Sequence, residues 1–240
     1  MTTMQLAKPR ARAHRAGKGE QAALNLRAMD EEQLAELAEQ LKGSAVPGVR
    51  MTEREFVDWA FNHVDAEWAD GEVILMAPVS NAHDSVDMWL GTLLYQFVEA
   101  RALGVVKRDM FVRFTRRRRR RVPDIMFIAE GHRNRILPTY IDGAPDLIVE
   151  IVSPDSQNRD RRDKYLDYEA GGVREYWIID PMSQTLDAYT LRGRKYDELP
   201  VKSGRIDSVV LPGVFLRSKW LFGRQRPKVA QVLKEFGIKD

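Results

Sequence analysis

The sequence predicts an α/β (α+β) fold with a mixed central β-sheet flanked by two main helices. Three observations lead to this class. Segment 80–104 carries apolar residues at helical spacing, and segment 146–152 is an almost continuous apolar run, which is typical of a strand buried on both faces. Strand-like and helix-like segments also alternate, and we expect the order β-α-β-β-β-α-β-β.

The composition suits one globular domain with some extra length. The chain has 240 residues, of which 44% are hydrophobic and 30% charged. It has 38 basic and 35 acidic residues, so any affinity for nucleic acid must come from local patches. The absence of cysteine excludes disulfides, thiolate nucleophiles and cysteine zinc sites. No apolar run reaches the ~20 residues of a membrane span, so we expect a soluble, cytoplasmic protein without a membrane partner.

Residues 1–50 are expected to form a basic, largely flexible N-terminal extension with one short helix. Segment 1–29 is basic and poor in large apolar residues. A solvated tail is one interpretation, and weak binding to phosphate backbones is the alternative. Segment 31–41 has leucines at the spacing of an amphipathic helix, and KGSAVPG at 42–48 is predicted to be a linker.

The main domain is expected over residues 51–223. Thr52 and Glu55 have the T-x-x-E spacing of a capping box, and the apolar stripe that follows predicts a helix ending near His63. The helix in segment 80–104 should turn five side chains inward and stop at Gly104. These side chains are Val86, Leu90, Leu93, Leu94 and Phe97.

The other elements of this domain follow from their apolar runs and turn residues. In order, they are a turn and buried strand at 70–78, strands at 110–114 and 122–129, a loop at 130–145, a strand at 146–154, a helix at 157–170 ending at Gly171 and Gly172, strands at 174–180 and 185–191, and further short strands. Residues 224–240 should form a tail with a short helix.

Two carboxylates interrupt apolar strands. Glu150 lies within DLIVEIV, and Asp124 follows Pro123 at the start of another strand. Burying an unpaired carboxylate costs several kcal/mol, so such groups are normally paired, hydrogen-bonded or bound to a metal. If the two strands are neighbours, the pair suits Mg²⁺ or Mn²⁺. The alternative for each residue is a salt bridge or capping contact at a strand end.

Lys164 supplies a candidate cation near these carboxylates. A helical wheel places Arg161, Lys164, Tyr165 and Tyr168 on one side, which should pack onto the sheet. The ammonium could reach the Glu150 strand and there stabilise a pentavalent phosphorane or hold an attacking water. Alternatively, it extends to solvent.

Together Asp124, Glu150 and Lys164 resemble the PD-(D/E)xK nuclease superfamily, which has the restriction endonuclease-like fold. Over residues 51–222 the chain more closely resembles the Uma-two family of bacterial restriction endonuclease-like proteins. The matching segments, in order, are GEVILMAP, SNAHDSV, VPDIMFI, APDLIVEIVSP, RDKYLDYEAGGVREYWIIDP and LPGVFL.

The resemblance implies that Asp124 and Glu150 bind the metal. In the E-x-K form the lysine would stand at 152, where this chain has Val152, so the lysine of the following helix, Lys164, is expected to take its place. Glu72 and His83 also match family positions, and either could complete the metal shell. For His83 the alternative is a hydrogen-bonding role at the helix start.

The expected function is therefore that of a Mg²⁺- or Mn²⁺-dependent endonuclease, a hydrolase that acts on phosphodiester bonds, with DNA as the expected substrate. The resemblance implies 5'-phosphate and 3'-hydroxyl products. A homodimer would suit cleavage of both strands. One alternative is a non-catalytic nucleic-acid-binding module that uses the basic hairpin and N-terminus, and another is a scaffold on a retained nuclease fold.

Six consecutive arginines precede Asp124. We expect them at a hairpin tip, with alternate side chains pointing into solvent on both sides. They form either a solvated face or a contact to the DNA backbone near the active site. These residues are Arg116, Arg117, Arg118, Arg119, Arg120 and Arg121.

Overall fold

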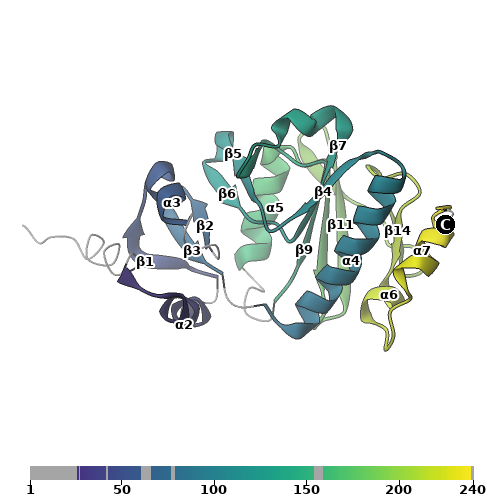
Figure 1. Ribbon diagram of the computed structural model, residues 1–240, viewed down its shortest axis with the longest axis horizontal. Helices are drawn as coiled ribbons and strands as arrows, with labels where there is room; N and C mark the ends of the chain where they lie inside the picture. The colour runs from purple at the N-terminus through teal and green to yellow at the C-terminus, as the bar shows by residue number, and fades with distance from the viewer. Residues whose placement is uncertain are drawn as a thin grey trace, which may run out of the picture.

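The computed structural model describes residues 26, 28–41, 43–60, 66–76, 79–153 and 159–238, with only the backbone of 159–161. Residues 1–25, where a flexible tail is expected, lie outside this range. The described chain forms two six-stranded sheets and one two-stranded sheet, with helices packed around them (Figure 1). The mixed α/β class predicted from the sequence is confirmed.

The central sheet has the strand order β12-β11-β10-β9-β7-β4. Only β9 and β10 pair in parallel, and the other neighbours are antiparallel, so the sheet is mixed as predicted. Every residue of β9 and β10 is buried, which explains their continuous apolar sequences. The strands are β4 (Gly104–Arg108), β7 (Ile125–Ala129), β9 (Leu147–Ile151), β10 (Glu175–Asp180), β11 (Thr185–Arg192) and β12 (Lys195–Glu198).

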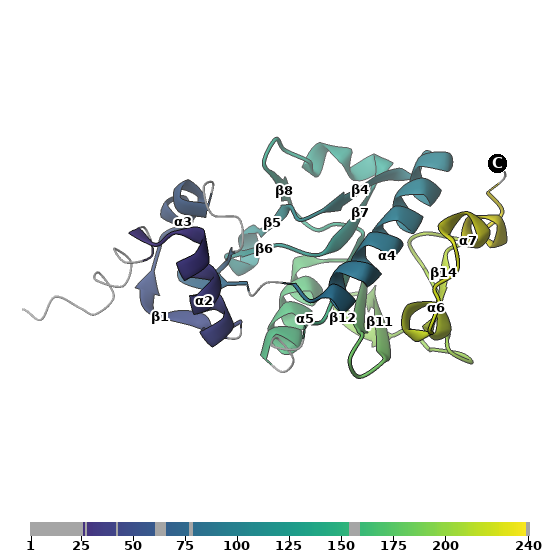
Figure 2. The same ribbon diagram turned by 60° about the horizontal axis from the view of Figure 1, so that its bottom comes forward.

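The two main helices, α4 (Asn81–Ala100) and α5 (Arg159–Gly171), lie on opposite faces of this sheet (Figures 1 and 2). Phe127 of β7 belongs to the hydrophobic cluster that includes Leu90 of α4. Its neighbour Met126 belongs to the cluster that includes Tyr168 of α5. Because side chains alternate along a strand, the two clusters mark the two faces of the sheet.

Helix α4 begins and packs as the sequence predicts. Ser80 is the N-cap, and its hydroxyl accepts from the backbone N–H of His83 at 3.2 Å. The five side chains predicted to face inward are all fully buried. Gly104, where the sequence predicts that the helical segment stops, is also the first residue of β4, a strand that the sequence did not predict. A Cβ at Gly104 would lie 2.1 Å from the carbonyl oxygen of Ile128, so only glycine permits this close pairing.

The second six-stranded sheet has the order β1-β3-β2-β6-β5-β8 and was not predicted as a unit. Two sequence interpretations are corrected here. The supposed linker 42–48 contributes most of its residues to edge strand β1, which tolerates Pro47 because an edge can leave an N–H unpaired. The supposed loop 130–145 holds the 3₁₀ helix η2 and strand β8. The bounds are β1 (Ala45–Arg50), β2 (Ala66–Ala69), β3 (Glu72–Leu75), β5 (Phe111–Phe114), β6 (Arg119–Arg121), η2 (Glu130–Arg135) and β8 (Tyr140–Asp142).

Two N-terminal helices pack against this second sheet. Helix α2 spans Glu31–Leu41, as predicted, and α3 is described from Glu53 to Ala60, so the end expected near His63 lies outside the described residues. The predicted capping box is present: the backbone N–H of Thr52 donates to Glu55 Oε2 at 2.7 Å, and that of Glu55 donates to Thr52 Oγ1 at 3.2 Å. One hydrophobic cluster joins both helices to β1, β2 and β3.

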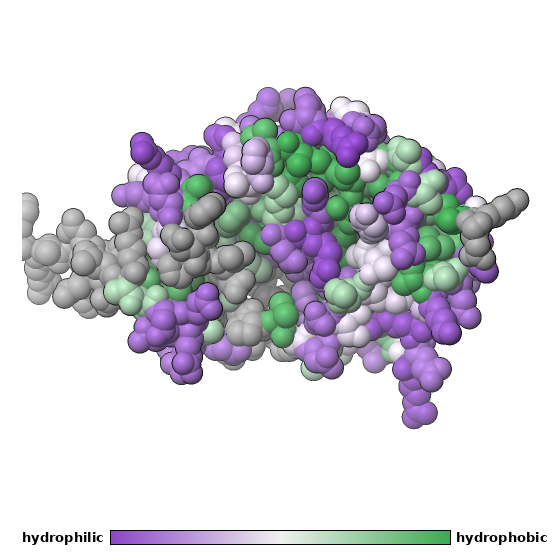
Figure 3. Space-filling view, viewed as in Figure 1, coloured by the Kyte–Doolittle hydropathy of each residue, from purple (hydrophilic) through white to green (hydrophobic). Residues whose placement is uncertain are grey.

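The C-terminal segment packs beside α4 (Figure 1). Phe236 lies edge-on to Phe97 of α4, with ring centroids 5.6 Å apart. None of the described helices is long and apolar enough to cross a membrane. On the face drawn in Figure 3, hydrophilic and apolar side chains are interspersed. The C-terminal elements are β13 (Arg205–Asp207), β14 (Phe215–Arg217), α6 (Ser218–Phe222) and α7 (Val229–Glu235).

Candidate active site

The strands that carry the two predicted metal-binding carboxylates are neighbours. Pairing of β7 with β9 sets Ile125 opposite Val149, and the same antiparallel register places Asp124 opposite Glu150. The two strands are also joined through the aspartate side chain, because Asp124 Oδ2 accepts the backbone N–H of Ile151 at 2.6 Å. The pairing of β7 and β9 therefore brings Asp124 and Glu150 together at one end of the sheet.

Glu150 is buried and is held by two side chains of α5. Lys164 Nζ donates to Glu150 Oε2 at 3.0 Å, and the Tyr168 hydroxyl donates to Glu150 Oε1 at 2.5 Å. Lys164 is 5% exposed, so its ammonium turns towards the sheet and does not extend to solvent. Burial and then the negative charge of Glu150 raise the pKa of Tyr168 well above its usual value, so the phenol stays protonated as a donor.

His83 joins the site through Asp124. Its Nε2 lies 3.3 Å from Asp124 Oδ1, and the side chain is 7% exposed. Burial lowers the pKa of His83, but the hydrogen bond to Asp124 and its negative charge outweigh burial and raise the pKa overall. The backbone N–H of His83 also donates to the hydroxyl of the N-cap Ser80, so His83 makes a hydrogen bond at the start of the helix, as the alternative interpretation expected. Within the described chain, His83 Nδ1 is buried without a hydrogen-bond partner.

Glu72 does not reach these groups in the described structure. Its side chain is 46% exposed, and its carboxylate lies 3.9 Å from the Arg50 guanidinium on the neighbouring strand β1. Of the two residues that could complete the site, the structure brings only His83 to Asp124.

Glu67 of β2 is a member of the site that the sequence analysis missed. It is 2% exposed, and its Oε1 lies 3.7 Å from Lys164 Nζ. Arg121 donates to Glu67 Oε2 at 2.6 Å, and the backbone N–H of Val122 donates to Oε1 at 3.0 Å. Burial raises the pKa of Glu67, but the charges of Lys164 and Arg121 outweigh it, so the pKa is lowered and the group is a carboxylate.

A sequence signal for Glu67 does exist. The residue stands in Ala66–Ala69, AEWA, where a carboxylate interrupts a short apolar strand just as Glu150 interrupts DLIVEIV. The strand has only four residues, so its apolar pattern is too short for periodicity to distinguish a buried strand from a loop.

The arginine run forms the predicted hairpin, but half of it does not face solvent. Strands β5 and β6 pair in antiparallel fashion, joined by the 3₁₀ turn Thr115–Arg117. Arg120 and Arg121 are buried, and Arg119 is only 17% exposed, because β6 lies inside the second sheet between β2 and β5. The expectation that the arginines point into solvent on both sides is wrong for these three residues.

Carboxylates compensate each of these inner arginines. Asp167 of α5 accepts from Arg117, Arg119 and Arg121, with the shortest contact at 2.8 Å from Arg121 Nη2. Arg120 donates to Glu53 at 2.8 Å and lies over the Tyr140 ring at 4.7 Å. These are structural ion pairs, and removing one partner would leave a buried charge uncompensated.

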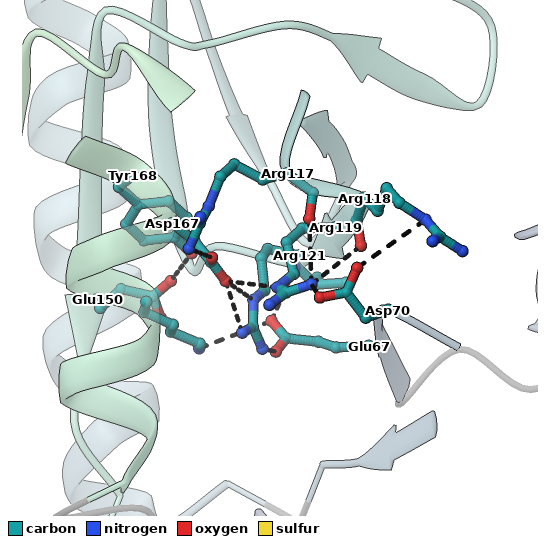
Figure 4. A network of polar contacts seen from close by, with 11 residues as sticks. Glu67, Asp70, Arg117, Arg118, Arg119, Arg121, Glu150, Asp167 and Tyr168 are labelled. Carbon is teal, nitrogen blue, oxygen red and sulfur yellow. Dashed lines mark hydrogen bonds and ion pairs between the residues drawn. The ribbon is translucent and has the colours of Figure 1, made fainter. Parts of the chain in front are cut away.

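The ion pairs form one network from the hairpin to the site (Figure 4). At its exposed end, Asp70 pairs with Arg118 and Arg119. Through Asp167 and Arg121 the contacts continue to Glu67, and Lys164 then joins Glu67 to Glu150. The second sheet, α5 and the central sheet are thus tied together at the candidate site.

The carboxylates of the site supply part of the ligand shell that a hard divalent cation needs. Among the described residues, no group of three or more His, Cys, Asp or Glu side chains could hold a metal ion. Mg²⁺ and Mn²⁺ are nevertheless bound by one or two protein carboxylates, with water and phosphate oxygens completing the shell. Asp124 and Glu150 supply such a pair, and carboxylate oxygens that accept one hydrogen bond retain a second lone pair.

Comparisons with known proteins give the family and the fold. The model of the Uma2 family, described as "Putative restriction endonuclease", matches residues 54–218. An uncharacterized protein from Synechocystis is 22% identical over 147 residues, which cover 60% of this chain and 76% of that protein. The crystal structure of a putative nuclease belonging to DUF820, from Anabaena variabilis, superposes with a TM-score of 0.61 at 20% identity, covering 72% of this chain and 97% of that one.

Proposed function

Because the chain belongs to the Uma2 family, we propose that it is a nuclease that hydrolyses phosphodiester bonds in DNA with the help of Mg²⁺ or Mn²⁺. One observation carries the proposal: Asp124 and Glu150 lie opposite each other on paired strands, and Lys164 donates to Glu150 at 3.0 Å. Two carboxylates and a cation at one point are the groups that a metal-assisted phosphodiesterase requires.

Asp124 and Glu150 would hold the metal ion. When bound, such an ion lowers the pKa of a water molecule and neutralises charge on the scissile phosphate. The protein fixes both carboxylates in advance. The backbone N–H of Ile151 and the ring of His83 hold Asp124, while Tyr168 and Lys164 hold Glu150. Ordered ligands lose little entropy when the cation and substrate bind.

Lys164 would stabilise the negative charge that develops on the phosphate. Its ammonium lies between Glu150 and Glu67, so it remains a cation in a buried place. A fixed positive charge in a site of low dielectric stabilises the transition state more than a solvated one. Lys164 thus does here what a lysine at position 152 would do.

The exposed end of the arginine hairpin would bring the phosphate backbone to the site. Arg116, Arg117 and Arg118 are exposed, whereas the buried Arg120 and Arg121 are not accessible to a ligand. Contacts of this kind give affinity without sequence preference.

The test is cleavage by the purified full-length chain of supercoiled, linear and single-stranded DNA and of RNA, each with Mg²⁺, Mn²⁺ or a chelator. We expect metal-dependent cleavage of DNA that Asp124→Asn, Glu150→Gln and Lys164→Met each reduce by at least about a hundredfold. Glu72→Gln is the matched control and should cleave like wild type. Absence of cleavage with every substrate, or full activity of Asp124→Asn, would refute the proposal. Salt-sensitive binding without cleavage would favour a non-catalytic module.

A further inference from the structure

The C-terminal segment has a one-sided charge. Between Asp207 and Glu235 the sequence contains no acidic residue and six basic ones. In the chain as a whole, 38 basic residues face 35 acidic ones, so this imbalance is local. The six are Arg217, Lys219, Arg224, Arg226, Lys228 and Lys234.

Two side chains, Arg226 and Trp89, hold the loop 223–228 against the first half of α4. Arg226 donates to the backbone oxygen of Ser85 at 2.9 Å and also to its hydroxyl. The Trp89 indole N–H donates to the backbone oxygen of Pro227 at 2.8 Å. His83, which contacts Asp124, lies on the first turn of the same helix. The basic loop is therefore at the end of the molecule that carries the candidate active site.

Three of the basic side chains are available to a ligand. Lys219, Arg224 and Lys228 are exposed, and in the described structure none has a carboxylate partner. Arg217 and Arg226 have structural tasks instead. Arg217 pairs with Glu235 at 2.6 Å and lies over Trp220, and Arg226 anchors the loop to α4.

We propose that Lys219, Arg224 and Lys228 form a second contact surface for the phosphate backbone of duplex DNA, beside the site of cleavage. The inference rests on the proposed function, because proximity to the candidate site favours nucleic acid over other anions. The loop that carries Arg224 and Lys228 lies across α4 from the active site, since Ser85, which Arg226 contacts, is two residues, or about 200°, from His83 on the helix. Lys219 lies on α6, directly before this loop. Because an α-helix is about 10–12 Å wide with its side chains, the basic surface and the candidate active site are separated by at least a distance of this order.

This separation predicts where the contact falls on the substrate. A distance of about 10–15 Å along a duplex corresponds to roughly three to five base pairs at 3.4 Å each. The three cations would thus bind phosphates roughly three to five base pairs from the scissile bond, while the arginine hairpin approaches from the second sheet.

The test is duplex binding measured by fluorescence anisotropy with a chelator present, in the Asp124→Asn background, so that cleavage cannot interfere. The variant combines Lys219→Ala, Arg224→Ala and Lys228→Ala. The slope of log affinity against log salt should fall by roughly 2 to 3, and affinity at low salt by at least about tenfold, because three phosphate contacts are lost. Affinity for a series of duplexes of different length gives a second measurement. The length at which affinity stops rising should be roughly three to five base pairs shorter for the variant than for the parent protein.

A matched control removes the same charge elsewhere. Arg54→Ala, Arg133→Ala and Arg192→Ala change exposed cations on α3, η2 and the far end of β11, and should leave the slope nearly unchanged. Equal affinity and slope for the two triple variants, or no binding of DNA by the parent protein, would overturn the inference. Cleavage by the wild-type protein decides the nuclease proposal separately. If the variant at Lys219, Arg224 and Lys228 binds DNA less tightly but the wild-type protein cleaves no substrate, the contact surface is supported and the nuclease proposal is rejected.

Discussion

Lys164 is the residue on which the charge balance of the buried site depends. Its ammonium lies 3.0 Å from Glu150 Oε2 and 3.7 Å from Glu67 Oε1, and all three side chains are less than a tenth exposed. Two carboxylates so close to each other repel unless a cation lies between them. The lysine therefore has a structural task in addition to the proposed chemical one.

We predict that Lys164→Met destabilises the fold by about 3–5 kcal/mol, because it leaves Glu67 and Glu150 without their shared cation. Urea unfolding at neutral pH measures the change. Adding Glu67→Gln to Lys164→Met should recover part of the stability but not the cleavage activity. If the double variant is no more stable than Lys164→Met alone, the two carboxylates are not coupled through the lysine.

Asp146 gives the protein a defined response to acid. Its side chain is 1% exposed and accepts from the backbone N–H of Ala129 at 2.9 Å and from His132 Nδ1 at 2.9 Å. Burial raises the pKa of Asp146, but these contacts outweigh it and lower the pKa below its unfolded value of 3.8. A lowered pKa means stability that is fully present above the unfolded pKa and is lost as the pH falls towards the folded one.

We therefore expect Asp146→Asn to cost about 1–3 kcal/mol at neutral pH. The difference from wild type should stay constant down to roughly pH 5 and shrink below roughly pH 4, as the wild-type carboxylate becomes protonated. Urea unfolding of both proteins at a series of pH values measures this. A difference that does not change with pH would mean that the native carboxylate keeps an ordinary pKa.

At the scale of single residues, sequence reasoning found two carboxylates that the structure places together. Glu150 and Asp124 interrupt apolar strands, and the two residues lie opposite each other on paired strands. The contact of Lys164 with Glu150 followed from helical periodicity. The buried state of Arg120 and Arg121 could not be predicted, because a run of arginines carries no sign of the Glu53, Glu67 and Asp167 carboxylates that a distant part of the chain brings to it.

Among the elements, the clarity of the local apolar pattern separates those that the sequence predicted from those that it did not. Helices α4 and α5 and the apolar strands β7, β9, β10 and β11 show clear periodicity and were predicted. Strands β1, β2, β4, β6 and β8 are three to six residues long, and several are rich in charged residues or contain Pro and Gly. Pairing with distant strands stabilises β1, β4 and β8, and local pattern cannot reveal that pairing. Strands β2 and β6 also pair with the next or preceding strand along the chain.

The β4–β7 pair provides a test at this scale. Gly104→Ala should destabilise the protein by several kcal/mol, because the new methyl group would lie 2.1 Å from the Ile128 carbonyl oxygen. Gly131→Ala is the control: a Cβ there has no neighbour within 4 Å, and its unfolding free energy should change by no more than about 0.5 kcal/mol. Thermal unfolding compares the two variants, and equal melting temperatures would contradict the close approach.

Across the whole molecule, the buried ion network joins parts that have separate hydrophobic clusters. One cluster covers the N-terminal helices with β1, β2 and β3, and two others cover the faces of the central sheet. Arg121 connects them, since it donates to Glu67 of β2 and to Asp167 of α5. We infer that unfolding is cooperative across these clusters partly because of this side chain.

Arg121→Met should weaken that connection and cost about 3–5 kcal/mol, because Glu67 and Asp167 lose a shared partner. Hydrogen exchange followed by mass spectrometry should then show α2, α3, β1, β2 and β3 exchanging faster than β9 and β10. Arg118→Met, which changes an exposed side chain of the same hairpin, is the control. Uniform acceleration across all segments would show that the clusters unfold together without Arg121.

Lys164 lies on a helix and not on the strand of Glu150, and this position affects how relatives of this protein can be found by a sequence search. A pattern search that requires a lysine two positions after the glutamate of an apolar strand rejects this chain at Val152. Here the two residues stand 14 positions apart on different elements, and their distance in sequence depends on the number of residues between the strand and the helix. A useful query would leave that interval open and require instead a tyrosine four residues after the lysine, because Tyr168 and Lys164 hold the same carboxylate.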